Sequence, residues 1–96
     1  MAQTGWPTKQ HKELFATIGA LRGADEAERF FRDLCTRSEL DAMAHRWEVV
    51  QLLAEGLPYL EVSKRAHAST TTVTRVAQWL RNGEGGYELA LRRRKR

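Results

Sequence analysis

The stretch from Thr36 to Gly56 limits the folds open to this chain more than any other segment. Apolar side chains recur in it every three or four residues over about five helical turns. Thr36 and Glu39 stand in the T-x-x-E order of a capping box, and Gly56 is a favourable helix stop. A long helix between these residues is therefore predicted as the centre of the domain. Its apolar stripe consists of Leu40, Met43, Ala44, Trp47, Val50 and Leu53.

Helical patterns also occur before and after this segment. Glycine is sparse inside the periodic stretches and the chain has only two prolines, which suits an all-α chain. One of them, Pro58, stands where the first turn of a helix tolerates proline. We therefore predict an all-α fold of five to six helices. Beside the central helix, the predicted helices span residues 9–23, 25–35, 58–66 and 70–82, and a helical turn or two is expected within 87–93.

The size of the chain favours association. A chain of 96 residues has room for one core, and burial in a monomer of that size is marginal. The apolar stripe of the central helix is also wider than one neighbouring helix would cover, which indicates contacts with several helices or with a second subunit. We predict a single domain over residues 1–91 that forms a homodimer. The residues that widen the stripe are Val49, Val50, Leu52, Leu53 and Leu57.

Charge is distributed unevenly. Residues 1–56 carry seven Lys or Arg against nine Asp or Glu, whereas residues 57–96 carry nine against three. Five of those nine cations form the terminal run Arg92–Arg96, so the tail accounts for most of the basic character. Such a tail is suited to contacts with nucleic-acid phosphates.

The sequence shows no sign of export or of membrane insertion. No apolar run approaches the roughly 20 residues that a membrane span requires. The N-terminal residues 1–12 lack the apolar centre of a signal peptide. Cys35 is the single cysteine and can form no disulfide within the chain. These features predict a cytoplasmic protein without a membrane partner.

Residues 58–82 show the pattern of a helix-turn-helix unit. A short helical stretch is broken by His67-Ala68-Ser69, and a longer one resumes after the break. The second stretch has apolar residues at i, i+3, i+4 and i+7 before Asn82-Gly83 ends it. These apolar residues are Val73, Val76, Ala77 and Leu80.

Threonines crowd the start of the second helix. β-Branched residues lower helix propensity by roughly half a kcal/mol each relative to alanine. An N-cap at Ser69 or Thr70 accounts for only one of them. Their hydroxyl and methyl groups suit contacts with phosphates, base edges and thymine methyls, and the first turns of this helix are what such units place in the major groove. The alternative is a solvated, capped helix start without a ligand. The candidate DNA-binding residues are Ser69, Thr70, Thr71, Thr72, Thr74, Lys64 and Arg65.

Residues 34–91 resemble the Trp repressor superfamily, and more closely its YerC/YecD-type branch. The resemblance lies in the long helix, in the A-S-T-x-T-[VI]-[ST]-R start of the recognition helix, and in the N-G-x-G-G-Y that follows it. It implies an intertwined all-helical homodimer whose two recognition helices enter successive major grooves of a double-stranded operator. It also implies a transcriptional regulator, most simply a repressor.

The resemblance further implies an effector pocket. The Trp repressor holds L-tryptophan with residues that match Thr36, Arg46 and Arg75. It has glycine and serine, however, where this chain has Val76 and Trp79. We therefore expect Trp79 to fill the pocket from within and L-tryptophan not to bind, which leaves either another small-molecule corepressor or no ligand. Alternatively, the two arginines have a structural role and pair with acidic groups or carbonyls between subunits.

Other chemistry has little support in the sequence. His45 and Glu48 share a helix face but lack a third metal ligand nearby, and no nucleophile-base pattern is present. We expect no enzyme, no metal and no cofactor. Two functions compete with operator binding: nucleic-acid binding through the basic tail without sequence preference, and a helical protein-interaction module.

Overall fold

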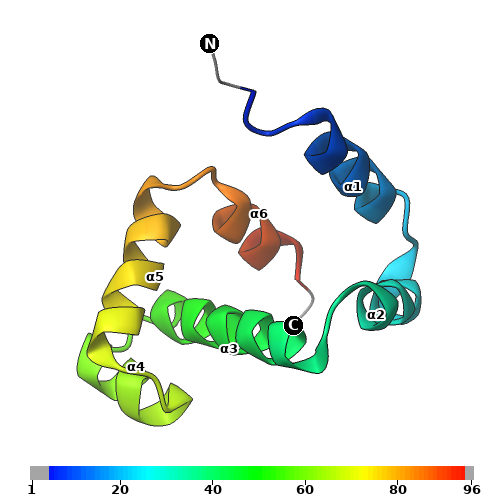
Figure 1. Cartoon of the computed structure of the whole chain (residues 1–96). Coiled ribbons are helices and arrows are strands. Elements are labelled where there is room, and N and C mark those ends of the chain that lie inside the picture. Colours follow the sequence, from blue (N-terminus) through cyan, green and yellow to red (C-terminus); the bar gives the residue numbers. More distant parts are fainter. Residues whose placement is uncertain (1–4, 95–96) are drawn as a thin grey trace. The chain divides into compact units, whose positions relative to one another are not determined.

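The computed structural model describes residues 5–94 as six α-helices without a strand (Figure 1). Both the all-α class and the number of helices confirm the prediction. No helix in this part of the chain is long and apolar enough to cross a membrane. The helices are α1 (Lys9–Gly19), α2 (Gly23–Leu34), α3 (Arg37–Ala54), α4 (Tyr59–Ala66), α5 (Thr70–Asn82) and α6 (Gly86–Arg93).

The central helix α3 begins as the sequence predicts. The Thr36 N–H donates to Oε1 of Glu39 at 2.8 Å, and the Glu39 N–H donates to Oγ1 of Thr36 at 3.1 Å. This reciprocal pair is the predicted capping box, and it satisfies two N–H groups that have no partner inside the helix.

Gly23 is the last residue of the predicted helix over residues 9–23, but it has a different role in the structure. It does not end the first helix, which finishes at Gly19, but is the first residue of α2. The Glu26 carboxylate accepts a hydrogen bond of 2.8 Å from the Arg22 N–H, which stabilises a helix start at this point. Gly23 has a φ of 84°, which glycine adopts without strain.

The chain forms two compact units, residues 1–40 and 41–96. In the first unit, α1 and α2 contain no buried residue. Phe15 is 55% exposed and Leu34 is 50% exposed. Two amphipathic helices thus leave apolar side chains at the surface. The prediction of a single domain over residues 1–91 stays a prediction.

The core lies in the second unit, where α3, α4 and α5 each contribute buried residues. Four of these residues are fully buried valines. Valine has one strongly preferred rotamer in a helix, so burial restricts its side chain little further. Each such burial contributes roughly 1.5–3 kcal/mol. The buried residues are Val49, Val50, Val62, Ala66, Val73, Val76 and Ala77.

The last helix α6 carries part of the predicted basic tail. Arg92 and Arg93 lie in its last turn, where positive charge complements the helix dipole. The Arg94 Nη1 donates to Oε1 of Gln51 on α3 at 2.6 Å. Helical structure and this hydrogen bond therefore fix part of the run predicted as a tail. Its last two residues, 95–96, lie outside the described residues.

Candidate nucleic-acid interface

Helices α4 and α5 form a helix-turn-helix whose turn is held by internal hydrogen bonds. His67 adopts the left-handed conformation with a φ of 55°, which histidine tolerates better than most residues. The Ala68 N–H donates to the Ser63 carbonyl at 3.0 Å, and the Ser63 hydroxyl donates to the Ala68 carbonyl. The angle between the two helices is therefore fixed by backbone groups as well as by the core.

His45 attaches this unit to the central helix. Its Nε2 lies 2.6 Å from the carbonyl oxygen of Ala66, the last residue of α4. A carbonyl can only accept, so Nε2 carries the proton. From the sequence, His45 is only a weak candidate for a metal ligand. Nothing in the local pattern indicates this role, because the partners lie 21 residues apart.

The threonine run divides into two groups. Ser69 is the N-cap of α5, and its Oγ accepts from the Thr72 N–H at 3.1 Å and donates to Oγ1 of Thr72 at 3.0 Å. Thr72 is half-buried, whereas Thr70, Thr71 and Thr74 are exposed. The first pair shapes the helix start, and the three exposed threonines are available to a ligand.

The exposed threonines lie on one face of α5 with two longer polar side chains. This face forms a shallow depression of about 330 Å³. Gln78 belongs to it and was not among the predicted residues, although its spacing of four from Thr74 places both on the same side of the helix. The residues that line the depression are Thr70, Thr71, Thr74, Arg75 and Gln78.

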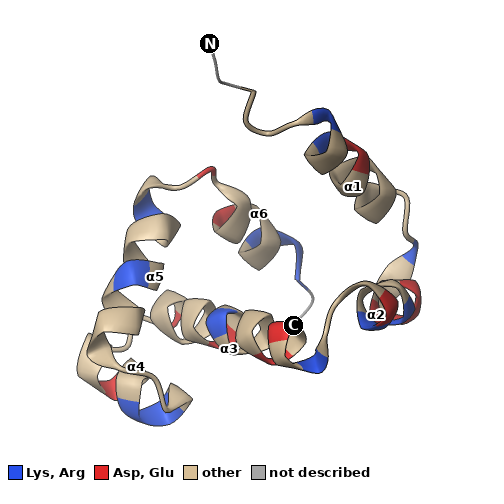
Figure 2. Ribbon diagram, in the orientation of Figure 1, with Lys and Arg blue, Asp and Glu red and all other residues tan. Residues whose placement is uncertain are grey.

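The charge of the helix-turn-helix suits a polyanion. Lys64 and Arg65 are exposed in the last turn of α4, as expected for phosphate contacts. Helix α5 contains no acidic residue, and α4 contains only Glu61 (Figure 2). Arg81 donates from Nη1 to the Tyr59 hydroxyl at 2.9 Å, so this arginine also links the two helices.

A pocket of about 370 Å³ brings Arg46 and Arg75 together, as the resemblance implies. Val76, Trp79 and Tyr87 line its walls. Val76 is 5% exposed, but Trp79 is 60% exposed, so the expectation that Trp79 buries itself and fills this pocket is wrong for the described chain. The helix places both side chains on the same side, yet Trp79 lies near the end of α5, where it also lines a second pocket beside the following loop.

Thr36, the third residue of the expected effector pocket, belongs to the first unit. There its hydroxyl accepts a hydrogen bond in the capping box. In the part of the chain that the structure describes, no group of three or more His, Cys, Asp or Glu side chains is placed to hold a metal ion.

The fold, with the exposed first turns of α5, defines an all-α helix-turn-helix protein. Residues 9–95 match the family model of the Trp repressor protein, so the chain belongs to the Trp repressor family, a DNA-binding regulatory fold. The chain is 41% identical over 85 residues to the uncharacterized protein YerC of Bacillus subtilis (strain 168), covering 88% of this chain and 82% of that protein.

Two crystal structures share the fold. A TrpR like protein from Eubacterium eligens ATCC 27750 gives a TM-score of 0.81 at 37% identity, over 90% of this chain and 89% of that one. A Staphylococcus aureus protein gives 0.79 at 33% identity, over 88% and 84% of the two chains. The predicted family and its six-helix fold are confirmed.

Proposed function

We propose that this chain is a sequence-specific transcriptional regulator, acting as a repressor, that reads double-stranded DNA in the cytoplasm with the first turns of α5. The observation that carries this proposal is the exposure of Thr70, Thr71 and Thr74 at the start of a helix whose other face is core. In helix-turn-helix proteins this position reaches base edges in the major groove. The family to which the chain belongs supports the same function.

The phosphate contacts come from the helix ends. Ser69 and Thr70 at the start of α5 and Lys64 and Arg65 at the end of α4 are all exposed. Phosphate contacts fix the register of the protein on DNA, and the threonine side chains then discriminate between bases. Thr72 takes part through Ser69, whose hydroxyl it engages.

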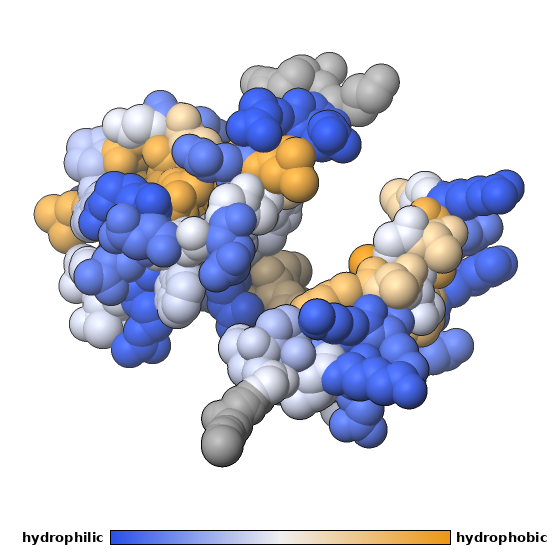
Figure 3. Space-filling model, turned by 90° about the horizontal axis from the view of Figure 1, so that it is seen from above, coloured by the Kyte–Doolittle hydropathy of each residue, from blue (hydrophilic) through white to orange (hydrophobic). Residues whose placement is uncertain are grey.

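The active form in this proposal is a homodimer. Apolar side chains reach the surface of each unit (Figure 3), and α1 and α2 contain no buried residue. A second copy that covers the exposed faces with Phe15 and Leu34 would remove this apolar surface from water. Sedimentation at micromolar concentration is expected to give about twice the chain mass. A folded monomer with a cooperative melt would contradict the dimer.

A selection experiment tests operator binding. Sequences bound by the full chain are recovered from a random duplex pool, and the affinity of the consensus is compared with that of a scrambled duplex over a series of salt concentrations. Operator binding predicts a specificity ratio of roughly a thousandfold or more at physiological salt. Binding through the tail alone would be indifferent to sequence and would fall steeply with salt. A protein-interaction module would bind neither duplex at low salt.

The pocket with Arg46 and Arg75 is the proposed effector site. Both guanidinium groups can bind an anionic group. L-Tryptophan is not the proposed effector, because Val76 and Trp79 line this pocket with larger side chains than the glycine and serine of the Trp repressor. The proposed function includes no enzymatic step.

A further inference from the structure

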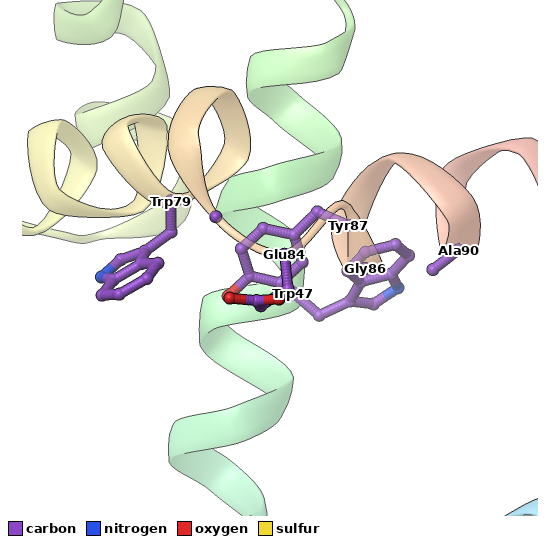
Figure 4. A pocket seen from close by; sticks show the side chains of 7 residues that line it. Trp47, Trp79, Glu84, Gly86, Tyr87 and Ala90 are labelled. Atoms are coloured by element: carbon purple, nitrogen blue, oxygen red, sulfur yellow. The ribbon is translucent and has the colours of Figure 1, made fainter. Parts of the chain in front are cut away.

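The loop between α5 and α6 borders a second pocket, of about 490 Å³, whose lining includes three aromatic side chains. Trp47 of α3, Trp79 of α5 and Tyr87 of α6 all line it (Figure 4). The ring centroids of Trp47 and Tyr87 are 6.3 Å apart with 37° between the planes. Three rings from three helices therefore present aromatic surface to one space, which is termed the aromatic pocket below.

The loop requires glycine to hold this arrangement. A Cβ atom at Gly83 would lie 2.5 Å from the carbonyl oxygen of Trp79 and 3.2 Å from its ring. Gly83 also donates its N–H to that carbonyl at 2.9 Å. Only a residue without a side chain can pass this close to the indole, so the loop and Trp79 are positioned together.

Glu84 supplies the only charge among the residues that line the aromatic pocket. Its side chain lines the same space as the indoles of Trp47 and Trp79 (Figure 4). The described residues offer it no salt-bridge partner. Since α5 ends and α6 begins at this loop, the opposite partial charges of the two helix ends offset each other. A carboxylate beside aromatic faces is the surrounding that favours an organic cation, because the faces of the rings are also electronegative.

The neighbouring pocket, which contains Arg46 and Arg75, indicates a second chemical group on the ligand. Trp79 and Tyr87 line both pockets, so the aromatic pocket is adjacent to the pocket that contains Arg46 and Arg75. These two arginines would repel a simple cation. They would complement a ligand that carries an anionic group in addition to its cationic one.

We propose that the aromatic pocket binds the quaternary ammonium group of a small zwitterion, whose phosphate or carboxylate group lies at Arg46 and Arg75. The methyl groups on the nitrogen pack against the apolar walls. The Glu84 carboxylate offsets the positive charge of the ammonium group, which the aromatic rings stabilise only in part. The part of this proposal that concerns the anionic group depends on the effector site of the proposed function. The ammonium half is independent of DNA binding.

Calorimetric titration of the full chain with phosphocholine tests the proposal without DNA. The matched ligand is 3,3-dimethylbutyl phosphate, which replaces the trimethylammonium group by tert-butyl and keeps the phosphate. One phosphocholine is expected to bind saturably per chain, and the isostere with its uncharged tert-butyl group roughly three- to thirtyfold more weakly. Glu84→Gln and Trp79→Leu should each lower phosphocholine affinity by roughly fivefold or more. Glu88→Gln, an exposed carboxylate outside the lining, is the matched control and should leave the affinity unchanged.

Several outcomes would overturn the inference. Absence of saturable phosphocholine binding at millimolar concentration is one. Equal binding of the isostere would show that the ammonium group contributes nothing and that the arginines alone hold the ligand. An equal loss in Glu88→Gln would show that the loss in Glu84→Gln reflects net charge and not a contact in the aromatic pocket. If Trp79→Leu dissociates an oligomer and phosphocholine does not bind, the aromatic pocket is covered by a second copy. A chain that binds phosphocholine but no operator would retain this inference and lose the proposed function.

Discussion

Replacement of Ser69 separates the folding role of the recognition-helix start from its proposed DNA contact. Ser69→Ala removes the hydrogen bond from the Thr72 N–H and the one to the Thr72 hydroxyl. Loss of an N-cap of this kind costs about 1 kcal/mol, within a range of roughly 0.5–2. For a domain of this size, that corresponds to a midpoint lower by about 4–8 °C. Thermal unfolding followed by circular dichroism at a fixed chain concentration measures it.

Ser69→Asp should keep the cap of α5 and weaken DNA binding instead. Aspartate caps a helix as well as serine does, and its charge is favourable at a helix N-terminus, so the midpoint should stay within about 2 °C of wild type. Near a DNA phosphate, the same carboxylate adds a repulsion of about 1 kcal/mol at 4 Å in bulk water and about 4 kcal/mol at an effective dielectric constant of 20. DNA affinity should fall by roughly tenfold at low salt, and the difference should shrink as salt is added.

Fluorescence anisotropy with a labelled operator measures this affinity. Ser38→Asp is the matched control, because it adds the same charge in the first turn of α3, outside the helix-turn-helix. If Ser69→Asp binds operator as wild type does, the start of α5 does not lie near phosphates. If Ser69→Asp melts as low as Ser69→Ala, the cap is not what Ser69 contributes.

Four further predictions concern the site and its supports. Thr71→Ala and Thr74→Ala should each lower specific DNA affinity by about 1–3 kcal/mol with little change in melting, and unchanged affinity of the double variant would exclude base reading. His45→Phe leaves the Ala66 carbonyl without its donor and should lower the free energy of unfolding by about 1–3 kcal/mol in urea, whereas an unchanged denaturation midpoint would show that the bond is dispensable. Deletion of Arg92–Arg96 should weaken binding to all duplexes alike and flatten the salt slope, and a loss restricted to the operator would contradict that role. Added L-tryptophan should not change the melting midpoint, and a saturable rise would show that it binds the folded chain.

The features that could be predicted from the sequence are those set by neighbouring residues. The capping box at Thr36 and Glu39 depends on residues three apart, and the apolar spacing of α5 depends on residues three and four apart. Ser69 was one of two candidates for the N-cap, and the structure selects it. Each of these is a property of one helix turn, so a linear pattern contains it.

The features that could not be predicted depend on residues distant in sequence. The hydrogen bond from His45 joins residues 21 apart, and the one from Arg94 to Gln51 joins residues 43 apart. The exposure of Trp79 depends on the path of the loop after α5, which helical periodicity does not contain. Periodicity placed Val76 and Trp79 on one side of the helix correctly, but it could not tell which of the two reaches the core.

The two faces of α5 have separate tasks, and this separation affects how relatives can diverge. Val73, Val76 and Ala77 hold the helix in the core, whereas Thr71 and Thr74 make no contribution to that core. Under the proposed function, mutations at the exposed positions therefore alter operator preference at little cost in folding free energy. A gene duplicate could acquire a new set of target promoters through substitutions on one helix face, while the scaffold that presents the face is inherited intact.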